Sequence, residues 1–276
     1  MKLPYAFLIY ASGLFFLGCG STSPTVHTTP YGKHIPIREH SVQSVMWQQN
    51  AAEYRALCYQ AFNLATLRLD AILANPDLKG KKLAIITDID ETVLDNSPYA
   101  ATMIAKDLEY VPESWTAWVN LVDADPLPGA KAFLDHAHKN GVRIFYVSNR
   151  TVAELPATLE NLKKVEFPNA DKNYMLFKDE TSSKEERFNK IREDYTVVLY
   201  LGDNLSDFSS KFRATSTKER NDLADELRDK FGMEYIVLPN ASYGDWEDRG
   251  IYQGRHDWTP VQKDSIRRAS LRGGGF

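Results

Sequence analysis

Two aspartates, Asp88 and Asp90, follow directly on a short apolar run in this 276-residue chain. Residues 83–87 are rich in β-branched side chains, which predicts a strand covered on both faces of a sheet. Open α/β sheets bind ligands just beyond the carboxyl ends of such strands. Two carboxylates at that place repel each other unless a cation lies between them, and Mg²⁺ prefers oxygen ligands. The pair therefore predicts a Mg²⁺ site; the alternative is a strand that ends in a solvated, aspartate-rich turn.

Polar residues also follow two later apolar runs. Ser148 and Asn149 follow the first of them, and Asp203 and Asp207 follow the second. In a parallel sheet the carboxyl ends of the strands meet at one edge, and Lys184, at the start of an expected helix, can join them there. Carboxylates, a hydroxyl, an amide and an ammonium are the groups that phosphoryl transfer requires, because its transition state spreads negative charge over the equatorial oxygens.

The first pair of carboxylates would carry the covalent and proton-transfer steps. Asp88 lies nearest to the strand, where the backbone is rigid, so we expect it to be the nucleophile and to form an aspartyl-phosphate. Asp90 would protonate the leaving alkoxide and then deprotonate the attacking water.

The other residues would bind the phosphate or the metal ion. The hydroxyl of Ser148 and the N–H of Asn149 would hold phosphoryl oxygens, and Lys184 would pair with the phosphate and neutralise the nucleophile. Asp203 would ligate Mg²⁺, and Asp207 would either ligate it or orient its waters. Taken singly, Lys184 and Asp207 read as solvated surface residues; their occurrence together and in this order favours a site.

Strands alternate with helices along most of the chain, which predicts βαβ units and a parallel sheet with right-handed crossovers. The fold class is therefore α/β. The expected strands are 83–87, 142–147, 174–177, 197–201 and 235–238. The expected helices are 41–74, 128–140, 151–164, 182–194, 217–231 and a last one from residue 259.

An aromatic segment that is helical in outline, residues 100–123, follows the first motif and would overhang the site. Pro112 can begin a second helix within it. Trp118 could form a wall on which a flat substrate stacks, or one apolar face of the helix, whereas we expect Trp115 to pack in the core. Tyr243 is open to the same two interpretations as Trp118.

Composition limits the possible classes of protein. Apolar content of 43% and charged content of 25% are ordinary values for a globular protein with a large core. The length suits one core with an insertion or two unequal domains. A net charge of -4 gives no indication of nucleic-acid binding, and two cysteines cannot make a disulfide framework. We expect Cys58, which has apolar neighbours in its helix, to be a buried and inert thiol.

The first 40 residues resemble an export and anchoring segment. Residues 1–18 have the charge and apolar run of a signal peptide and are too short for a confident spanning helix. Cys19 ends a sequence that resembles a bacterial lipobox, so it would carry the lipid that anchors the protein to a membrane without spanning it. Residues 19–40 would form a flexible tether. The alternative is ordinary secretion after cleavage near Ser21.

Four strings in this order resemble the four motifs of the haloacid dehalogenase (HAD) superfamily: Asp88-Ile-Asp90-Glu-Thr92, Ser148-Asn-Arg150, Lys184 and Gly202-Asp203-Asn-Leu-Ser-Asp207. The longer strings Asp88-Ile-Asp-Glu-Thr-Val-Leu-Asp-Asn-Ser-Pro-Tyr99 and Gly202-Asp-Asn-Leu-Ser-Asp-Phe208 resemble class C acid phosphatases, the bacterial outer-membrane lipoprotein acid phosphatases. The resemblance extends over about residues 41–275.

This resemblance implies a Rossmann-like HAD core with a smaller α-helical domain, formed from about residues 41–75 and 97–127. It implies a homodimer and a broad phosphomonoesterase activity, often on nucleotides, at acidic pH. The implied Mg²⁺ ligands are Asp88, the backbone carbonyl of Asp90 and Asp203, and we expect Asp207 to join them. Trp118 and Tyr243 lie at positions that resemble the ring-stacking residues of the family, and we expect Thr92 of the first motif to contact the substrate as well.

Two positions depart from the family pattern. Ser148 stands where these enzymes commonly carry threonine, and it keeps the hydroxyl. A further lysine is common just before Lys184, where this chain has Thr181-Ser182-Ser183. Lys178 is therefore the alternative to Lys184.

Three functions are compatible with these residues. The first is an exported, Mg²⁺-dependent acid phosphatase acting on nucleoside monophosphates and aryl phosphates, which we favour. The second is a non-catalytic surface lipoprotein that binds a nucleotide or another ligand. The third is a phosphotransferase that uses alcohol acceptors.

Overall fold

A five-stranded parallel sheet forms the centre of the computed structural model, which describes residues 36–274. The strand order is β5-β4-β1-β6-β7, and every neighbouring pair in it is parallel. The strands are β1 (Leu83–Thr87), β4 (Arg143–Thr151), β5 (Met175–Lys178), β6 (Thr196–Gly202) and β7 (Tyr235–Val237). The predicted α/β fold is confirmed, and β1, which carries the first motif, is the middle strand.

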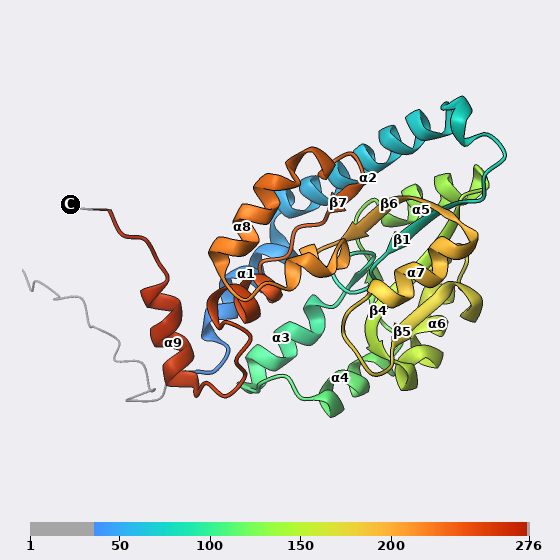
Figure 1. Cartoon of the computed structure of the whole chain (residues 1–276). Coiled ribbons are helices and arrows are strands. Elements are labelled where there is room, and N and C mark those ends of the chain that lie inside the picture. The colour runs from blue at the N-terminus through green and yellow to red at the C-terminus, as the bar shows by residue number, and fades with distance from the viewer. Residues whose placement is uncertain (1–35, 275–276) are drawn as a thin grey trace, which may run out of the picture. The chain divides into compact units, whose positions relative to one another are not determined.

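Helices cover both faces of this sheet (Figure 1). Alternate residues of β1 point to opposite faces, as in any strand. Ile85 packs in the core formed with α2 (Ala52–Leu73), α5 (Ala130–Lys139) and α6 (Leu155–Lys164). Ala84 and Ile86 pack in a second core with side chains of α7 (Glu185–Asp194). Burial on both sides explains why the β1 sequence is continuously apolar.

The remaining elements lie around these layers. The α-helices are α1 (Glu39–Asn50), α3 (Ser97–Lys106), α4 (Pro112–Val119), α8 (Thr217–Glu226) and α9 (Pro260–Ala269). A π-helix spans Trp246–Ile251 and was not predicted. Two short strands, β2 (Leu94–Asp95) and β3 (Asp125–Pro126), pair antiparallel and join the two ends of the segment that contains α3 and α4.

The expectation of one helix over residues 41–74 was wrong. The chain forms α1 and α2, separated at Ala51, whose backbone is extended (φ -81°, ψ 127°). The two helices have different partners. α1 packs on α3, whereas α2 packs on α5 and on the strands β6 and β7. The change of direction lets each helix bury its own apolar face.

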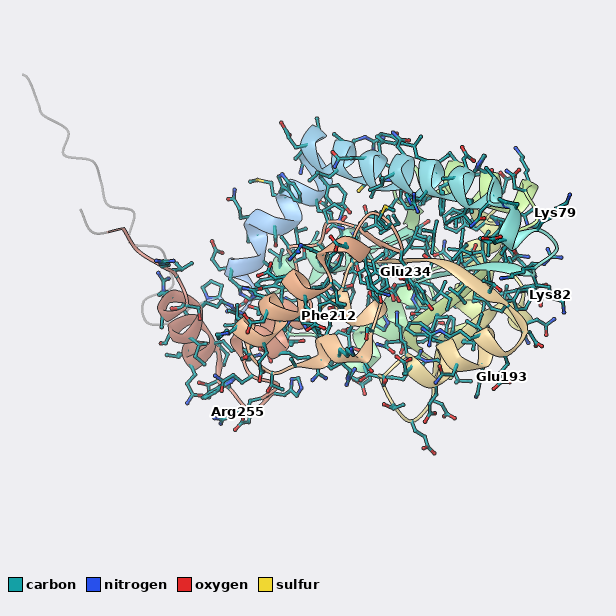
Figure 2. All side chains as sticks on the ribbon, turned by 45° about the horizontal axis from the view of Figure 1, so that its top comes forward. Lys79, Lys82, Glu193, Phe212, Glu234 and Arg255 are labelled. Carbon is teal, nitrogen blue, oxygen red and sulfur yellow. The ribbon has the colours of Figure 1, made fainter. Side chains whose placement is uncertain are left out.

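The connection between α2 and β1 marks the edge of the sheet that lies away from the site. Figure 2 shows Lys79 and Lys82 of this connection at one end of the described region, far from Arg255 near the C-terminal helix. Lys82 immediately precedes β1, so this end holds the amino ends of the parallel strands. The carboxyl ends, with Asp88, lie at the opposite edge.

Cys58 lies fully buried in α2. Burial raises the pKa of its thiol to about 11, which agrees with the expected inert side chain. No helix in the described part of the chain combines the length and the apolar character needed to cross a membrane. Residues 1–18, Cys19 and residues 19–35 of the expected tether lie outside the described residues.

Two leucines of α2 provide a test of this packing. Leu69 is fully buried against the sheet, whereas Leu67 is 68% exposed. Leu69→Ala should lower the free energy of unfolding by about 2–5 kcal/mol, because it leaves a cavity in the core. Leu67→Ala should change it by less than about 0.5 kcal/mol. Urea denaturation of both variants measures the difference, and equal effects would contradict the assigned face of α2.

Candidate active site

The carboxyl ends of β1, β4 and β6 bring the predicted motif residues together. Asp88 follows β1, and Asp203 follows β6. Ser148 and Asn149 lie in the last part of β4, which continues to Thr151 and is longer than expected. Ligand oxygens of Asp88, Asp203 and Asp207 all lie within 4.8 Å of one another. Asp203 and Asp207 lie 115 or more positions after Asp88 in the sequence, and the parallel sheet brings them to Asp88.

Lys184 lies between two of these carboxylates. It is the residue just before α7, and its side chain is almost fully buried. The ammonium donates a hydrogen bond to Oδ1 of Asp88 and lies 2.8 Å from Oδ1 of Asp207. The alternative residue, Lys178, ends β5, where it pairs with Thr151. The structure therefore places Lys184, and not Lys178, beside Asp88.

The charges at this edge are not balanced. Burial raises the pKa of Asp88, the carboxylates of Asp207 and Asp90 raise it further, and Lys184 lowers it. Burial also raises the pKa of Asp203, again with a contribution from Asp207. Burial alone would lower the pKa of Lys184, but the carboxylates of Asp207 and Asp88 raise it above its usual value. One ammonium for three carboxylates leaves an excess of negative charge that favours a bound cation.

The three carboxylates fit a hard divalent cation, which takes oxygen ligands. Their orientation is fixed by neighbours. Asp203 accepts hydrogen bonds from Nδ2 of Asn240 (2.8 Å) and from the hydroxyl of Thr92 (3.3 Å). Oδ2 of Asp207 accepts from the N–H of Asn204 at 3.1 Å. A Cβ atom on Gly202 would lie 2.5 Å from Cβ of Asp207, so only glycine permits this close approach. Asp88, Asp203 and Asp207 are therefore the side chains that would hold the ion.

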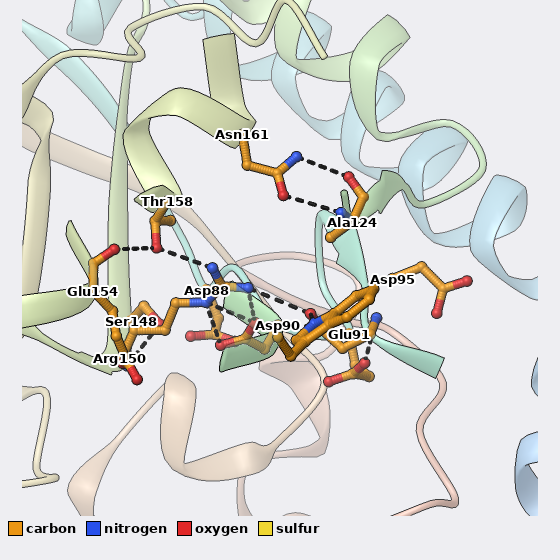
Figure 3. A network of polar contacts seen from close by, with 12 residues as sticks. Asp88, Asp90, Glu91, Asp95, Ala124, Ser148, Arg150, Glu154, Thr158 and Asn161 are labelled. Carbon is orange, nitrogen blue, oxygen red and sulfur yellow. Dashed lines mark hydrogen bonds and ion pairs between the residues drawn. The ribbon is translucent and has the colours of Figure 1, made fainter. Parts of the chain in front are cut away.

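A second charged network surrounds Asp90 (Figure 3). The guanidinium of Arg150 donates to Oδ1 of Asp90 from NH2 (2.7 Å) and from Nε (3.0 Å). Its NH1 donates to Thr158 of α6 at 2.9 Å. Arg150 is almost fully buried. It fixes Asp90 in place and adds the positive charge that a buried carboxylate requires.

Arg187 connects the end of β4 to the loop that precedes Lys184. Its NH1 donates to the carbonyl of Ser148 at 2.6 Å, and its NH2 donates to Oδ1 of Asn149 at 2.8 Å. The same NH2 donates to the carbonyl of Ser183 at 3.0 Å. One side chain therefore holds both the predicted phosphate-binding residues and the backbone beside the lysine.

The two candidate stacking residues are attached to the turn after β1. The Nε1–H of Trp118 donates to Oδ1 of Asn96 at 2.8 Å, and the hydroxyl of Tyr243 donates to Oε2 of Glu91. The N–H of Asn96 donates to Oε1 of Glu91 at 2.9 Å, which joins the two supports. Trp118 packs in part against the core, whereas Tyr243 is exposed. The partial packing of Trp118 agrees with its interpretation as an apolar helix face, and stacking of a substrate on its ring stays a prediction.

Trp115 is half-buried, although we expected it in the core. Its ring contacts Tyr99 edge to face, and the guanidinium of Arg150 lies 5.4 Å from its centroid. This cation–π contact adds a further support for Arg150.

Sequence reasoning assigned no role to four residues that the structure places here. They are Glu91, Asn96, Arg150 and Arg187. Arg150 is the last residue of the second motif string and Arg187 lies three residues after Lys184, so an arginine in or near a motif was the available signal. Glu91 and Asn96 lie within the first motif string, but their contacts with Tyr243 and Trp118 come from distant segments that the sequence does not bring together.

Comparison with known proteins agrees with this geometry. A family model described as "HAD superfamily, subfamily IIIB (Acid phosphatase)" matches residues 25–246. The chain belongs to this family. The family and the hydrolase class predicted from the motifs are therefore confirmed.

Two solved structures resemble this one closely. They are of the class C acid phosphatase from Bacillus anthracis, one of them with tungstate bound. Each is 38% identical, has a TM-score of 0.83, and aligns over 87% of this chain and 100% of that chain. A curated relative, the stem 31 kDa glycoprotein of Glycine max, is 29% identical over 137 residues, which are 48% of this chain. The match spans about half of that relative's length, 54%.

The buried Glu91 predicts a pH dependence of stability. Burial, with a contribution from Asp90, raises the pKa of Glu91 from 4.5 to about 8. The folded state therefore keeps a proton that the unfolded state releases, and stability falls as pH rises through this window. We expect the metal-free protein, in excess chelator, to unfold more easily at pH about 8 than at pH about 5.

Glu91→Gln should flatten this dependence, because glutamine keeps the shape and carries no charge. Glu53→Gln, at an exposed position of α2, is the matched control and should leave the dependence unchanged. Urea denaturation at both pH values measures the effect. An unchanged slope in Glu91→Gln would be inconsistent with a protonated Glu91 in the folded protein.

Proposed function

We propose that this protein is a Mg²⁺-dependent phosphomonoesterase that works through an aspartyl-phosphate on Asp88. The observation that carries the proposal is the convergence of Asp88, Asp203 and Asp207, two of which, Asp88 and Asp207, contact the buried ammonium of Lys184. Such a site would attract a divalent cation, because the cation balances the charge of the acids. The negative phosphate would then bind next to two positive groups, the ammonium of Lys184 and the metal ion.

The reaction has two displacements at phosphorus. A carboxylate oxygen of Asp88 attacks, the bond between phosphorus and the ester oxygen breaks, and Asp90 gives a proton to the departing oxygen. Asp90 then takes a proton from water, whose oxygen attacks the aspartyl-phosphate. The bond from Asp88 to phosphorus breaks, and inorganic phosphate leaves.

Polar groups of this chain would stabilise the charge that spreads over the phosphoryl oxygens. The hydroxyl of Ser148, the N–H of Asn149 and the ammonium of Lys184 are the donors. Arg187 keeps the first two in place through their backbone and amide oxygens. Mg²⁺ held by Asp88, Asp203 and Asp207, with the backbone carbonyl of Asp90, would supply further positive charge next to the phosphate. The tungstate bound to the class C enzyme from Bacillus anthracis supports an oxyanion site in this fold.

We propose nucleoside monophosphates and aryl phosphates as substrates. Both have a flat group that can stack on an aromatic ring. Trp118 bonds Asn96 and Tyr243 bonds Glu91, and these two residues of the turn after β1 bond each other close to the proposed catalytic carboxylates. The hydroxyl of Thr92 donates to Asp203, so Thr92 would lie between the metal site and the substrate and would contact the substrate.

We also propose export and a lipid anchor on Cys19, as the lipobox-like sequence indicates, which would hold the enzyme at a bacterial outer membrane. The homodimer, the acidic pH optimum and the smaller α domain stay predictions from the resemblance.

Replacement of the nucleophile tests the proposed chemistry. Asp88→Asn should remove hydrolysis of p-nitrophenyl phosphate almost completely while the far-UV circular dichroism stays unchanged, because asparagine cannot form the acyl phosphate. Excess chelator should also remove the activity of the wild type, and added Mg²⁺ should restore that activity. Asp229→Asn, at an exposed position, is the matched control. Full activity of Asp88→Asn, or of the wild type in chelator, would reject the mechanism.

The anchor has its own test. Cys19→Ser in the full-length protein, expressed in a bacterial host, should move the enzyme from the membrane fraction to the soluble exported fraction, because serine cannot carry the thioether-linked lipid. Phosphatase activity and immunoblots of the two fractions measure the distribution. If the cysteine and serine proteins distribute identically, the proposed lipid anchor is wrong.

A further inference from the structure

We propose that Asn96 is a positioning residue, which fixes the general acid Asp90 relative to the ring of Trp118. The proton of Asp90 is thereby delivered to the ester oxygen of leaving groups that stack on that ring. This inference rests on the phosphomonoesterase function proposed above and adds a determinant of its leaving-group preference.

The position of Asn96 in the fold is the first argument. It precedes α3 at the N-cap, where an asparagine side chain normally accepts a hydrogen bond from the first turn of the helix. In this structure its side chain makes no such bond. It is instead 2% exposed and points into the site. The side chain of Asn96 therefore bonds groups of the site and does not cap the helix.

Both ends of the Asn96 amide have partners in the site. Nδ2 donates to Oδ1 of Asp90 at 2.8 Å. Oδ1 accepts from Nε1 of Trp118 at 2.8 Å and, more weakly, from NH2 of Arg150 at 3.4 Å. These contacts also fix which end of the amide is oxygen, because Trp118 and Arg150 can only donate. A single planar group therefore joins the acid to the ring.

The two oxygens of Asp90 differ as a result. Oδ1 accepts from Asn96 and twice from Arg150, at 2.7 and 3.0 Å. Oδ2 accepts, among residues 36–274, only a longer bond of 3.3 Å from Nε of Arg150. An oxygen that accepts three hydrogen bonds has no room for a proton of its own. The transferred proton therefore belongs on Oδ2, and Asn96 is one of the two residues whose hydrogen bonds occupy Oδ1.

This arrangement matters most when the leaving oxygen needs a proton. As the bond from phosphorus to the ester oxygen breaks, its electron pair goes to that oxygen, which takes the proton from Oδ2. The p-nitrophenolate ion is stable and leaves without much help, whereas phenolate and nucleoside alkoxides are strong bases. Phenyl phosphate and p-nitrophenyl phosphate carry the same ring, so they differ mainly in this requirement.

The experiment compares kcat/KM of Asn96→Ala for these two esters in saturating Mg²⁺, because kcat/KM reports the first displacement. For phenyl phosphate we expect a fall of about 100-fold, which is the lower range for a lost general acid. For p-nitrophenyl phosphate we expect a fall of less than about 10-fold. An equal fall for both esters would overturn the inference and leave the proposed function intact.

Two further variants separate this role from a loss of stability. Asn96→Asp keeps the size and the acceptor for Trp118 but removes the donor to Asp90, so it should show the same selective loss even if Asn96→Ala fails to fold. Asn161→Ala removes another buried amide, which bonds the backbone of Ala124 at 3.1 and 2.9 Å (Figure 3). This variant should lower the melting temperature and change kcat/KM for the two esters by the same factor. A selective loss in Asn161→Ala, or none in Asn96→Asp, would contradict the positioning role.

The link to the ring is tested with Trp118→Phe, which keeps an aromatic ring and removes the N–H. In combination with Asn96→Ala, the two effects on kcat/KM for phenyl phosphate should be less than additive, because both variants break the same connection. Additive effects would overturn the connection. A wild-type enzyme that hydrolyses neither ester would instead reject the proposed function itself.

Discussion

The surplus of buried negative charge at the carboxyl edge of the sheet constrains the whole site. Asp88, Asp203 and Asp207 meet there, and within residues 36–274 the ammonium of Lys184 contacts two of them, Asp88 and Asp207. Charges out of water are destabilising unless partners surround them, so the fold must supply rigid partners or leave room for a cation. The cores on both faces of the sheet hold the strand ends rigidly enough to keep these groups together. The same instability would favour a bound divalent cation at these three carboxylates.

Two arginines extend this constraint to the neighbouring strands. Arg150 neutralises Asp90 and reaches α6, and Arg187 ties β4 to the loop of Lys184. Both use the guanidinium as a planar group with several fixed donors, which lysine could not replace. Each phosphate-binding or catalytic group is therefore held by a second buried residue, and a small displacement of either strand would be felt by all of them.

The turn after β1 connects this charged centre to the aromatic residues that would meet a substrate. Glu91 has a left-handed backbone (φ 53°), an uncommon conformation for a non-glycine residue. Its carboxyl accepts hydrogen bonds from Asn96 and Tyr243, and Asn96 in turn bonds Trp118. The segment with α3 and α4, and the segment after β7, are thereby attached to the turn that directly follows Asp88 and Asp90.

The sequence by itself determined the α/β class, the five strands, and the acids, hydroxyl and ammonium of the motifs, because these follow from local periodicity and from residue types with few alternative uses. It did not reveal the break between α1 and α2, the π-helix at Trp246–Ile251, or the parts played by Glu91, Asn96, Arg150 and Arg187. Those depend on contacts between segments far apart in the chain. Asn96 illustrates the difference: it occupies the N-cap position of α3, but its amide bonds Asp90 of the same turn and Trp118 of the distant α4 instead of the helix. Local propensity selects the elements, but only tertiary packing decides which polar groups find each other away from water.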